Sequence, residues 1–283
     1  MNLLAIYTEE ELKKIQSIEL NALEDIVRVC DELNIKYFLI GGSALGAIRH
    51  KGFIPWDDDI DIGMPREDYR KFLEKAPSFL SLNYHIQSPY NDVFCPYFYS
   101  KVRVNGTLFM EYCNRNLPIH HGVYVDIFPF DNVPDDDDKN LAQFNRVQRL
   151  IRLFSLRQIP DVSTRPIGLY QKIKAFFRKI LHVSLKVLPH TILLHLLEKE
   201  FTKYNNIETK AIACLNFPTW KTEYVLKVDL YPLVKHSFGD KKFFIPHNWD
   251  NYLGTHYGNY MRLPEKNKRY GHKPYKIQLN YVD

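Results

Sequence analysis

The chain has 283 residues, of which 45% are hydrophobic and 25% charged, and its formal net charge is +5. This composition supplies enough apolar side chains for a large core, so we expect one folded catalytic unit rather than two independent domains. The mild positive charge suits an anionic substrate or membrane surface, whereas the lack of zinc-finger spacing, RNP-like motifs or a dense Lys/Arg arm excludes nucleic acid as the expected partner.

An amphipathic helix is predicted at the start of the chain. Thr8 and Glu11 have the form of a capping box, and apolar residues recur at helical spacing as far as Leu33. Residues 9–11 are all acidic, unlike a signal peptide, and no apolar run reaches the roughly 18 residues of a spanning helix. We therefore predict a cytoplasmic protein, with peripheral contact at the inner face of the membrane left open. The scattered cysteines are expected to be reduced core thiols.

A strand and a glycine turn follow the first helix. Residues 37–40 form a short apolar run typical of a buried strand, which Gly41 and Gly42 close. A short helix is expected to begin at Ser43. Glycines in such a turn let the backbone approach a phosphate group, and the N–H groups at the helix start favour an anion.

A second strand is predicted to carry two carboxylates. Residues 59–62 alternate polar and apolar side chains, so Asp59 and Asp61 are expected on the same face. Pro65 suits the first turn of a helix that continues through residues 66–75.

A third strand, over residues 123–128, is expected to end at Pro129. Asp126 lies in its apolar run, where an unpaired charge would be costly to bury. The pattern predicts an α/β (α+β) fold in which a small mixed sheet is flanked by helices. We expect a core with the N-terminal helix in residues 1–135, and a mainly helical extension with the acceptor-side region in residues 136–283.

Two charged segments follow in this second half. The acidic run at residues 135–138 is interpreted as a solvated turn or helix N-terminus and not as a metal site. A helical pattern begins at Asn140. Residues 165–188 contain an apolar helical stripe among six basic residues and no acid. Two readings stay open for it, a helix packed on the sheet with a solvated basic face, or a helix resting in an anionic membrane interface.

The glycine turn and the carboxylates together suit a metal-bound polyphosphate. Asp59, Asp61 and Asp126 are the predicted catalytic residues and metal ligands, because Mg²⁺ (or Mn²⁺) prefers hard oxygen ligands and is usually completed by substrate phosphates. Gly41 and Gly42 are expected to let the donor phosphates approach, and Ser43 adds a hydroxyl.

Other side chains have a structural and a functional interpretation. Asp57 and Asp58 either act directly, position Arg49 or Lys51, or simply avoid burial in the approach turn. Lys101 and Arg103 alternate along a probable strand and meet phosphate or form a solvated face. Four aromatic residues pack in the core or stack on a base, a sugar or a quaternary ammonium group: Trp56, Tyr97, Tyr99 and Phe128. The histidines at 120, 121 and 272 lack zinc-site spacing and are interpreted as polar surface or acceptor-side residues.

The stretch from Gly42 to Ile62, with its run from Trp56 to Asp61, resembles the signature of the LicD family. The segment from Gly122 to Pro129 resembles the family's second block, and residues 257–264 resemble its C-terminal block. The resemblance spans most of the chain and is weakest over residues 140–235. Gly42-Ser43 stands where many members carry Gly-Thr, which keeps the hydroxyl.

The resemblance implies a nucleotidyltransferase-type core that moves phosphocholine or another phosphoalcohol from a CDP-linked donor. The implied acceptor is a cell-surface glycan, such as teichoic acid or lipopolysaccharide, or its lipid-linked precursor. It also implies that Gly42 and Ser43 touch the donor phosphates, with Arg49 and Lys51 near them.

Three other functions stay open from the residues alone. A nucleotidyltransferase that releases pyrophosphate would need the same metal site. Asp59 to Asp61 could also be the DxD of a sugar-nucleotide glycosyltransferase. An inactive glycan-binding module is disfavoured, because three carboxylates are retained.

Overall fold

The computed structural model describes residues 7–162, 165–272 and 274–279. The first helix, α1 (Glu9–Glu32), has the predicted capping box, in which Thr8 Oγ1 accepts from Glu11 N and the Glu11 side chain accepts from Thr8 N. Its apolar stripe lies against the sheet and contributes to the larger of two buried clusters. The predicted amphipathic helix is confirmed.

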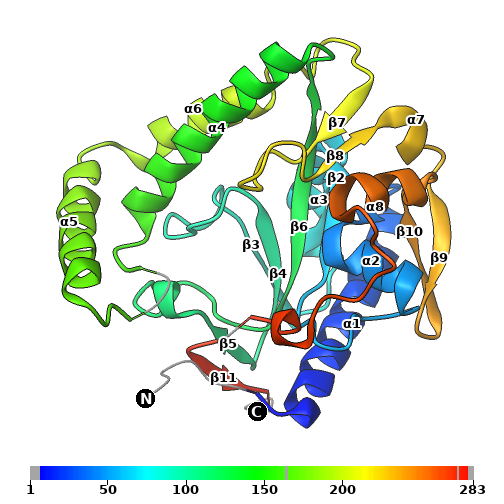
Figure 1. Ribbon diagram of the computed structural model, residues 1–283, viewed down its shortest axis with the longest axis horizontal. Helices are drawn as coiled ribbons and strands as arrows, with labels where there is room; N and C mark the ends of the chain where they lie inside the picture. Colours follow the sequence, from blue (N-terminus) through cyan, green and yellow to red (C-terminus); the bar gives the residue numbers. More distant parts are fainter. Residues whose placement is uncertain (1–6, 163–164, 273, 280–283) are drawn as a thin grey trace.

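A mixed sheet forms the centre of the molecule (Figure 1). Its main strand order is β1-β2-β6-β4-β3, and β7 pairs with both β6 and β8. Among the described strands of this sheet, β2 and β6 are parallel and the other pairs are antiparallel, so the predicted small mixed sheet is confirmed. The strands are β1 (Phe38–Leu39), β2 (Asp61–Pro65), β3 (Tyr84–Gln87), β4 (Ser100–Val104), β6 (Tyr124–Val133), β7 (Ala211–Ala213) and β8 (Tyr224–Leu226).

Helices and two small two-stranded sheets, β9 with β10 and β5 with β11, surround this centre. In Figure 1, α2 and α8 lie with the pair β9 and β10 on the right, while α4, α5 and α6 extend to the left. The helices are α2 (Gly41–Arg49), α3 (Arg66–Lys75), α4 (Asp137–Gln158), α5 (Leu169–Leu185), α6 (His190–Phe201), α7 (Lys227–Leu230) and α8 (Trp249–Tyr257). The remaining strands are β5 (Leu108–Met110), β9 (Val234–Phe238), β10 (Lys241–Ile245) and β11 (Lys276–Gln278). Three short 3-10 turns are η1 (Ala76–Ser78), η2 (Tyr112–Asn114) and η3 (Lys266–Lys268).

The strand β6 does not end at Pro129 as predicted but continues to Val133. The backbone N of Asp126 donates to the O of Ile60, the residue just before β2. Successive N–H positions alternate sides, so the nitrogen of Pro129 points away from β2. On that side, the pairing of β6 with β4 extends no further than Ile127, and its pairing with β7 begins only at Asp131. The missing N–H of Pro129 therefore falls in the gap between two partners, where it costs no ladder hydrogen bond.

A second buried cluster joins α4 and α6 to β7. The acidic run at residues 135–138 is exposed, and Asp136 caps α4 by accepting from Lys139 N. The prediction of a solvated helix N-terminus is confirmed. Because β7 and β8 extend the sheet of the N-terminal half, the second half also contributes strands. The division at residue 135 stays a prediction.

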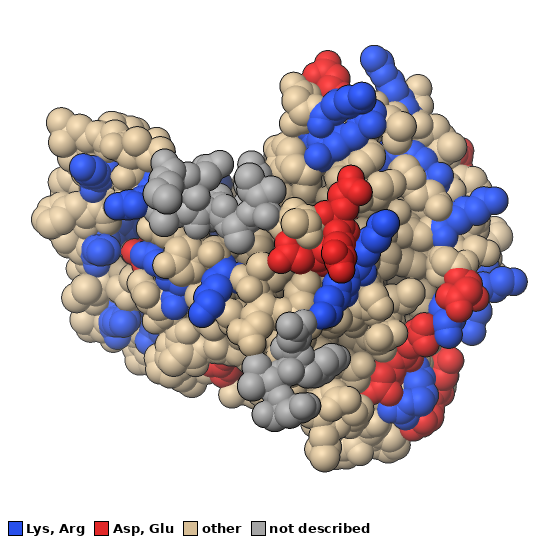
Figure 2. All heavy atoms as spheres, turned by 90° about the horizontal axis from the view of Figure 1, so that it is seen from below, with Lys and Arg blue, Asp and Glu red and all other residues tan. Residues whose placement is uncertain are grey.

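Figure 2 shows that most acidic side chains visible from below lie in the centre and right of the molecule.

The reading in which residues 165–188 pack their apolar stripe on the sheet is wrong, although Lys172, Lys174 and Lys179 are exposed, as that reading expects of the basic face. Helix α5 contacts α4, and its large apolar side chains are exposed, among them Tyr170, Phe176 and Phe177.

Candidate active site

Three charged side chains form a row across the sheet. Asp61 of β2 is the register partner of Asp126 of β6, and Asp126 is the partner of Lys101 of β4. Register partners on neighbouring strands project from the same face, so two carboxylates and an ammonium group share one surface. The structure thus brings together two of the predicted metal ligands and one predicted donor-binding residue.

Lys101 is buried beside Asp126. Its Nζ lies 2.6 Å from Asp126 Oδ1 and 2.8 Å from Oδ2, and 3.4 Å from the ring centroid of Tyr124. The rings of Tyr97 and Tyr99 also surround the ammonium, with centroids 4.8 Å and 5.3 Å from Nζ. The solvated-face interpretation of Lys101 is wrong, and these tyrosines surround the protein's own cation.

Arg103, two residues further along β4, is buried as well. Its Nε donates to Gln87 Oε1 at 3.0 Å and its NH1 donates to Gly122 O at 2.9 Å. Its Cζ lies 4.8 Å from the ring centroid of Tyr124. The solvated-face interpretation is therefore wrong for Arg103 as well. The contacts of its guanidinium with Gln87, Gly122 and Tyr124 give it a structural role.

Negative charge accumulates around Asp61. Burial and the charges of Asp59 and Asp126 raise the pKa of Asp61 well above its ordinary range. Burial and the neighbouring Asp59 raise the pKa of Asp57 to about 8. Burial also raises the pKa of Asp126, although Lys101 opposes that shift. The carboxylates are therefore only partly compensated by the protein's own cations.

This donor set fits a divalent cation. A cation bound among Asp59, Asp61 and Asp126 would relieve their mutual repulsion, and carboxylate oxygens are the ligands that Mg²⁺ prefers. The regular strand begins at Asp61, so Asp59 lies in the segment before β2 rather than on the strand itself.

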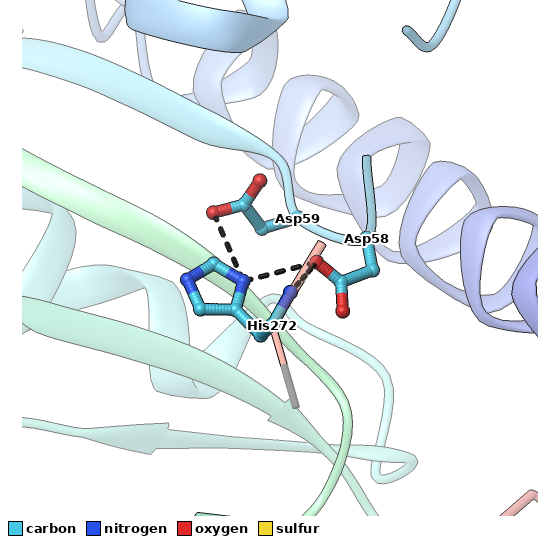
Figure 3. Close-up of side chains that lie close together, drawn as sticks. All are labelled: Asp58, Asp59 and His272. Atoms are coloured by element: carbon cyan, nitrogen blue, oxygen red, sulfur yellow. Dashed lines mark hydrogen bonds and ion pairs between the residues drawn. The ribbon is translucent and has the colours of Figure 1, made fainter. Parts of the chain in front are cut away.

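Asp58 is held by residues from both ends of the described chain (Figure 3). Tyr7 OH donates to Asp58 Oδ2 at 2.7 Å, and His272 N donates to Oδ1 at 2.8 Å. The His272 Nδ1 lies 3.0 Å from Asp58 Oδ1 and 3.8 Å from Asp59 Oδ2. The hydrogen bond with Asp58 raises the pKa of His272 to about 9, so the ring is a further cation beside the carboxylates.

These contacts correct one interpretation. Asp58 bonds with Tyr7 and His272 rather than positioning Arg49 or Lys51. His272 is exposed, as the polar-surface interpretation expects, and its ring also contacts Asp58 and Asp59. In the described part of the chain, ligand atoms of Asp58, Asp59 and His272 all lie within 4.8 Å of one another. Asp58 accepts from Tyr7 OH and from His272 N, and these contacts hold its loop to residues near both ends of the described chain.

The first turn of α2 lies beside Asp57 and Asp61. A Cβ at Gly42 would lie 2.8 Å from Asp57 Oδ2, so a side chain at Gly42 would collide with this carboxylate. Ser43 Oγ accepts from the backbone N of Asp61 at 2.8 Å and joins the start of α2 to the start of β2. Its contact is therefore not a helix cap. N–H groups in a first turn lack intrahelical partners and favour anions.

A buried network supports the same turn from α8. Tyr252 OH accepts from Gly41 N at 3.0 Å and donates to Glu223 Oε2 at 2.6 Å, while His256 Nε2 lies 3.4 Å from that oxygen. Burial raises the pKa of Glu223 to about 8. A Cβ at Gly41, where φ is +51°, would lie 3.4 Å from Glu223 Oε1 and 3.7 Å from Asp61 Oδ2. The network of Tyr252, Glu223 and His256 thus extends, through Gly41, to the carboxylate of Asp61.

A cavity of about 550 Å³ adjoins this turn, between α2 and the segment after α8. Arg49 and Trp56 line it, together with Tyr257 and Tyr260. Arg49 NH1 donates to Tyr260 O at 2.7 Å. The Tyr257 OH lies 3.8 Å from the Cβ position of Gly41, which places one wall of the cavity beside the first turn of α2.

The remaining predicted donor-binding residue, Lys51, is exposed in the turn after α2. It has a φ of +57°, and its carbonyl accepts from Gly239 N at 2.6 Å. Phe128 is buried, and its ring centroid lies 4.4 Å from that of Tyr99, which agrees with the core-packing interpretation.

The sequence interpretation missed Glu19, Glu223 and Tyr252. Glu19 had a visible signal, because an acid occupies the apolar stripe of the first helix between Ile15 and Ala22. In the structure it is buried, its Oε2 has no hydrogen-bond partner within the described chain, and burial with the charge of Asp59 raises its pKa. Glu223 and Tyr252 had no local signal, since neither lies in a recognisable motif.

Comparison with known proteins agrees with this arrangement. Residues 34–171 match the family described as LicD/FKTN/FKRP, nucleotidyltransferase domain. The chain is 26% identical over 273 residues to Lipopolysaccharide cholinephosphotransferase LicD of Haemophilus influenzae, covering 96% of this chain and 98% of that protein. Ribitol 5-phosphate transferase FKRP of Homo sapiens is 49% identical over 43 residues, which are 15% of this chain and 9% of that protein. An uncharacterized protein of Rickettsia prowazekii is 36% identical over 85 residues, 28% of this chain and 32% of that protein.

Proposed function

Because the chain belongs to the LicD family, we propose that it is a metal-dependent transferase that moves a phosphoalcohol from a CDP-linked donor onto a glycan. Phosphocholine or a similar group is the proposed cargo. The observation that carries the proposal is the row of Asp61, Asp126 and Lys101 beside the first turn of α2. The two relatives named for an activity are both transferases of phosphate-linked groups.

The donor would bind between this row and the cavity beside α2. We propose that its phosphates lie at Gly41, Gly42 and Ser43. The N–H of Gly41 donates to Tyr252 OH, so the donors that favour an anion in this first turn are those of Gly42 and Ser43. The nucleoside would occupy the cavity lined by Arg49 and Trp56. A cation held by the predicted ligands would supply stabilisation of the charge on the phosphoryl oxygens.

The reaction is an in-line displacement at the phosphorus of the transferred group. An acceptor hydroxyl forms the new P–O bond, the bond to CMP breaks, and CMP leaves with the electron pair. The hydroxyl proton passes to a carboxylate of the acidic group. Asp126 is a weaker base than Asp61 for this step, because both oxygens of Asp126 accept from Lys101. Lys101 stabilises the charge on Asp126 and keeps it in place.

The acceptor is proposed to be a cell-surface glycan or its lipid-linked precursor. The H. influenzae relative is named for lipopolysaccharide, which supports this class of acceptor without identifying the glycan. The proposed location is the cytoplasm. Within the described residues no single helix is long and apolar enough to cross a membrane, although the bent pair α5 and α6 meets the same criterion together.

The test is incubation of the protein with a panel of CDP-alcohols and Mg²⁺, with CMP release and the mass of the product as readouts. We expect CMP release with at least one CDP-alcohol and an acceptor, and no release by D61N. Pyrophosphate as the product would favour a nucleotidyltransferase. Binding of a sugar nucleotide, with no response to any CDP donor, would favour a glycosyltransferase and contradict the proposal.

A further inference from the structure

Helix α5 contacts the rest of the protein along one narrow stripe. Four of its residues are not exposed, at spacings of three, four and three, which is one face of a helix: Ala175, Arg178, His182 and Leu185. This stripe faces α4: His182 Nδ1 lies 3.1 Å from Leu156 O, and Arg178 Nε donates to Asp161 O just beyond α4 at 2.9 Å.

The opposite face of α5 is apolar and exposed. Ile173 and Ile180 lie about half a turn away from His182 at 100° per residue, and Phe176 and Phe177 flank them. Phe176 is 61% exposed and Phe177 is 63% exposed. A surface helix in a globular protein normally turns its apolar face inward, so α5 has the reverse orientation. Contiguous apolar patches of this kind mark an interaction surface.

Lysines border the apolar face on both sides. Lys172 and Lys179 follow one edge and Lys174 the other, and all three are exposed. No Asp or Glu occurs in residues 162–197. In Figure 2, the left part of the molecule, where α5 lies in Figure 1, shows Lys and Arg side chains spread over a surface that is mostly neither acidic nor basic. A partner must therefore be apolar at the centre and anionic at its edge.

The geometry favours a helix lying on a membrane rather than one crossing it. Helix α6 follows α5 at an angle of 95°, and its residues Leu193, Leu197 and Phe201 are buried in the second core cluster. Since α6 belongs to the protein body, α5 alone is free to enter a lipid surface.

We propose that α5 docks this protein on an anionic lipid surface. Its apolar face enters the boundary between headgroups and acyl chains, and Lys172, Lys174 and Lys179 contact the anionic headgroups. Interfacial helices combine such a face with basic flanks. The inference rests on the exposure and charge of α5 and does not depend on the proposed reaction.

The test is co-sedimentation with neutral vesicles and with vesicles that contain an anionic phospholipid, at low and high salt. Each Lys near an anionic surface contributes roughly a factor of five to partitioning, so K172Q/K174Q/K179Q should bind anionic vesicles about 100-fold more weakly. Arg178 is left unchanged, because its guanidinium bonds with Asp161 and Ile159 carbonyls. High salt should weaken binding of the wild type in the same way.

A matched control removes the same charge elsewhere. Lys13, Lys75 and Lys242 are exposed on α1, α3 and β10, and their triple change to Gln should leave vesicle binding unchanged. F176S/F177S should lose binding to anionic vesicles and keep the melting temperature of the wild type, because both side chains are exposed.

Three results would overturn the proposal. The first is a wild type that ignores anionic vesicles at low salt. The second is equal loss of binding in the control triple variant, which would mean that net charge alone acts. The third is a dimer in sedimentation velocity that F176S/F177S dissociates while vesicle binding is absent, which would assign the face to a second copy of the chain.

Discussion

Replacing Lys101 by Met tests whether the ammonium compensates the charge of Asp126. The pair is almost fully buried, with contacts of 2.6 Å and 2.8 Å. Removal of one partner from a buried pair costs about 3–5 kcal/mol, because the other charge is left without compensation. The loss of contacts with the tyrosine rings adds about 1–2 kcal/mol, which does not depend on pH.

Protonation of Asp126 limits the electrostatic part of this loss. In K101M the pKa of Asp126 lies higher in the folded chain than in the unfolded chain, so stability falls as pH rises above the unfolded value. Protonating a carboxyl with an ordinary pKa of about 3.9 costs about 4 kcal/mol at pH 7 and about 1.5 kcal/mol at pH 5. K101M should therefore be destabilised much more at pH 7 than at pH 5.

Urea unfolding of the four proteins in a double-mutant cycle measures this effect. In K101M/D126N the electrostatic loss should disappear and only the loss of the aromatic contacts should remain. Mg²⁺ should stabilise K101M more than K101M/D126N, because the cation replaces the missing charge. Lys235, an exposed lysine over the Phe244 ring, provides the control K235M. An equal cost of D126N with and without Lys101, or no difference between pH 5 and pH 7, would refute the reasoning.

Three further variants probe the surrounding groups. D59N and D61N should each lower transfer at least about 100-fold, since they remove charge that stabilises the transition state. Melting curves of both variants should show a retained fold. Turnover above about a tenth of the wild-type value would contradict a role as metal ligand. S43A should lose about 1 kcal/mol in urea unfolding, because Asp61 N loses its acceptor, and an unchanged midpoint would contradict this. For Glu223, whose pKa is raised to about 8 from its ordinary value of 4.5, folding favours the protonated form. Its contribution to stability is therefore full below the ordinary value and is lost as pH rises to about 8. E223Q should remove that fall from the stability profile, whereas an unchanged profile would assign the fall to other carboxyls.

Short-range patterns predicted much of the core. The period of 3.6 residues and the capping box placed α1, because both depend on neighbours in the sequence. The alternation over residues 59–62 indicated a strand here, but β2 begins only at Asp61 and leaves Asp59 before it. The apolar run that contains Asp126 predicted β6 from neighbouring residues as well. Its length was wrong, because the tolerance of Pro129 depends on where β4 and β7 end.

The contacts that complete the site could not be predicted from such patterns. Lys101 meets Asp126 only through the register of β4 against β6. Tyr252 reaches Gly41 from 211 residues away, and His272 reaches Asp58 from 214 residues away. Tertiary packing sets these distances. Glu19 is the exception, since an acid on an apolar helical face already indicates a special environment.

The hydrogen bonds of Tyr7 and His272 with Asp58 have a practical consequence for shortening or tagging this protein. One of these bonds comes from Tyr7 and the others from His272, while Gly271 packs so closely that a Cβ there would lie 2.5 Å from Asp58 Oδ1. Shortening the chain past Tyr7 or His272 would leave the buried Asp58 carboxylate with only some of its donors, although both residues lie far from Asp58 in the sequence. Boundaries for expression should therefore retain both terminal segments, and a cleaved preparation that binds metal poorly should first be checked for intact ends.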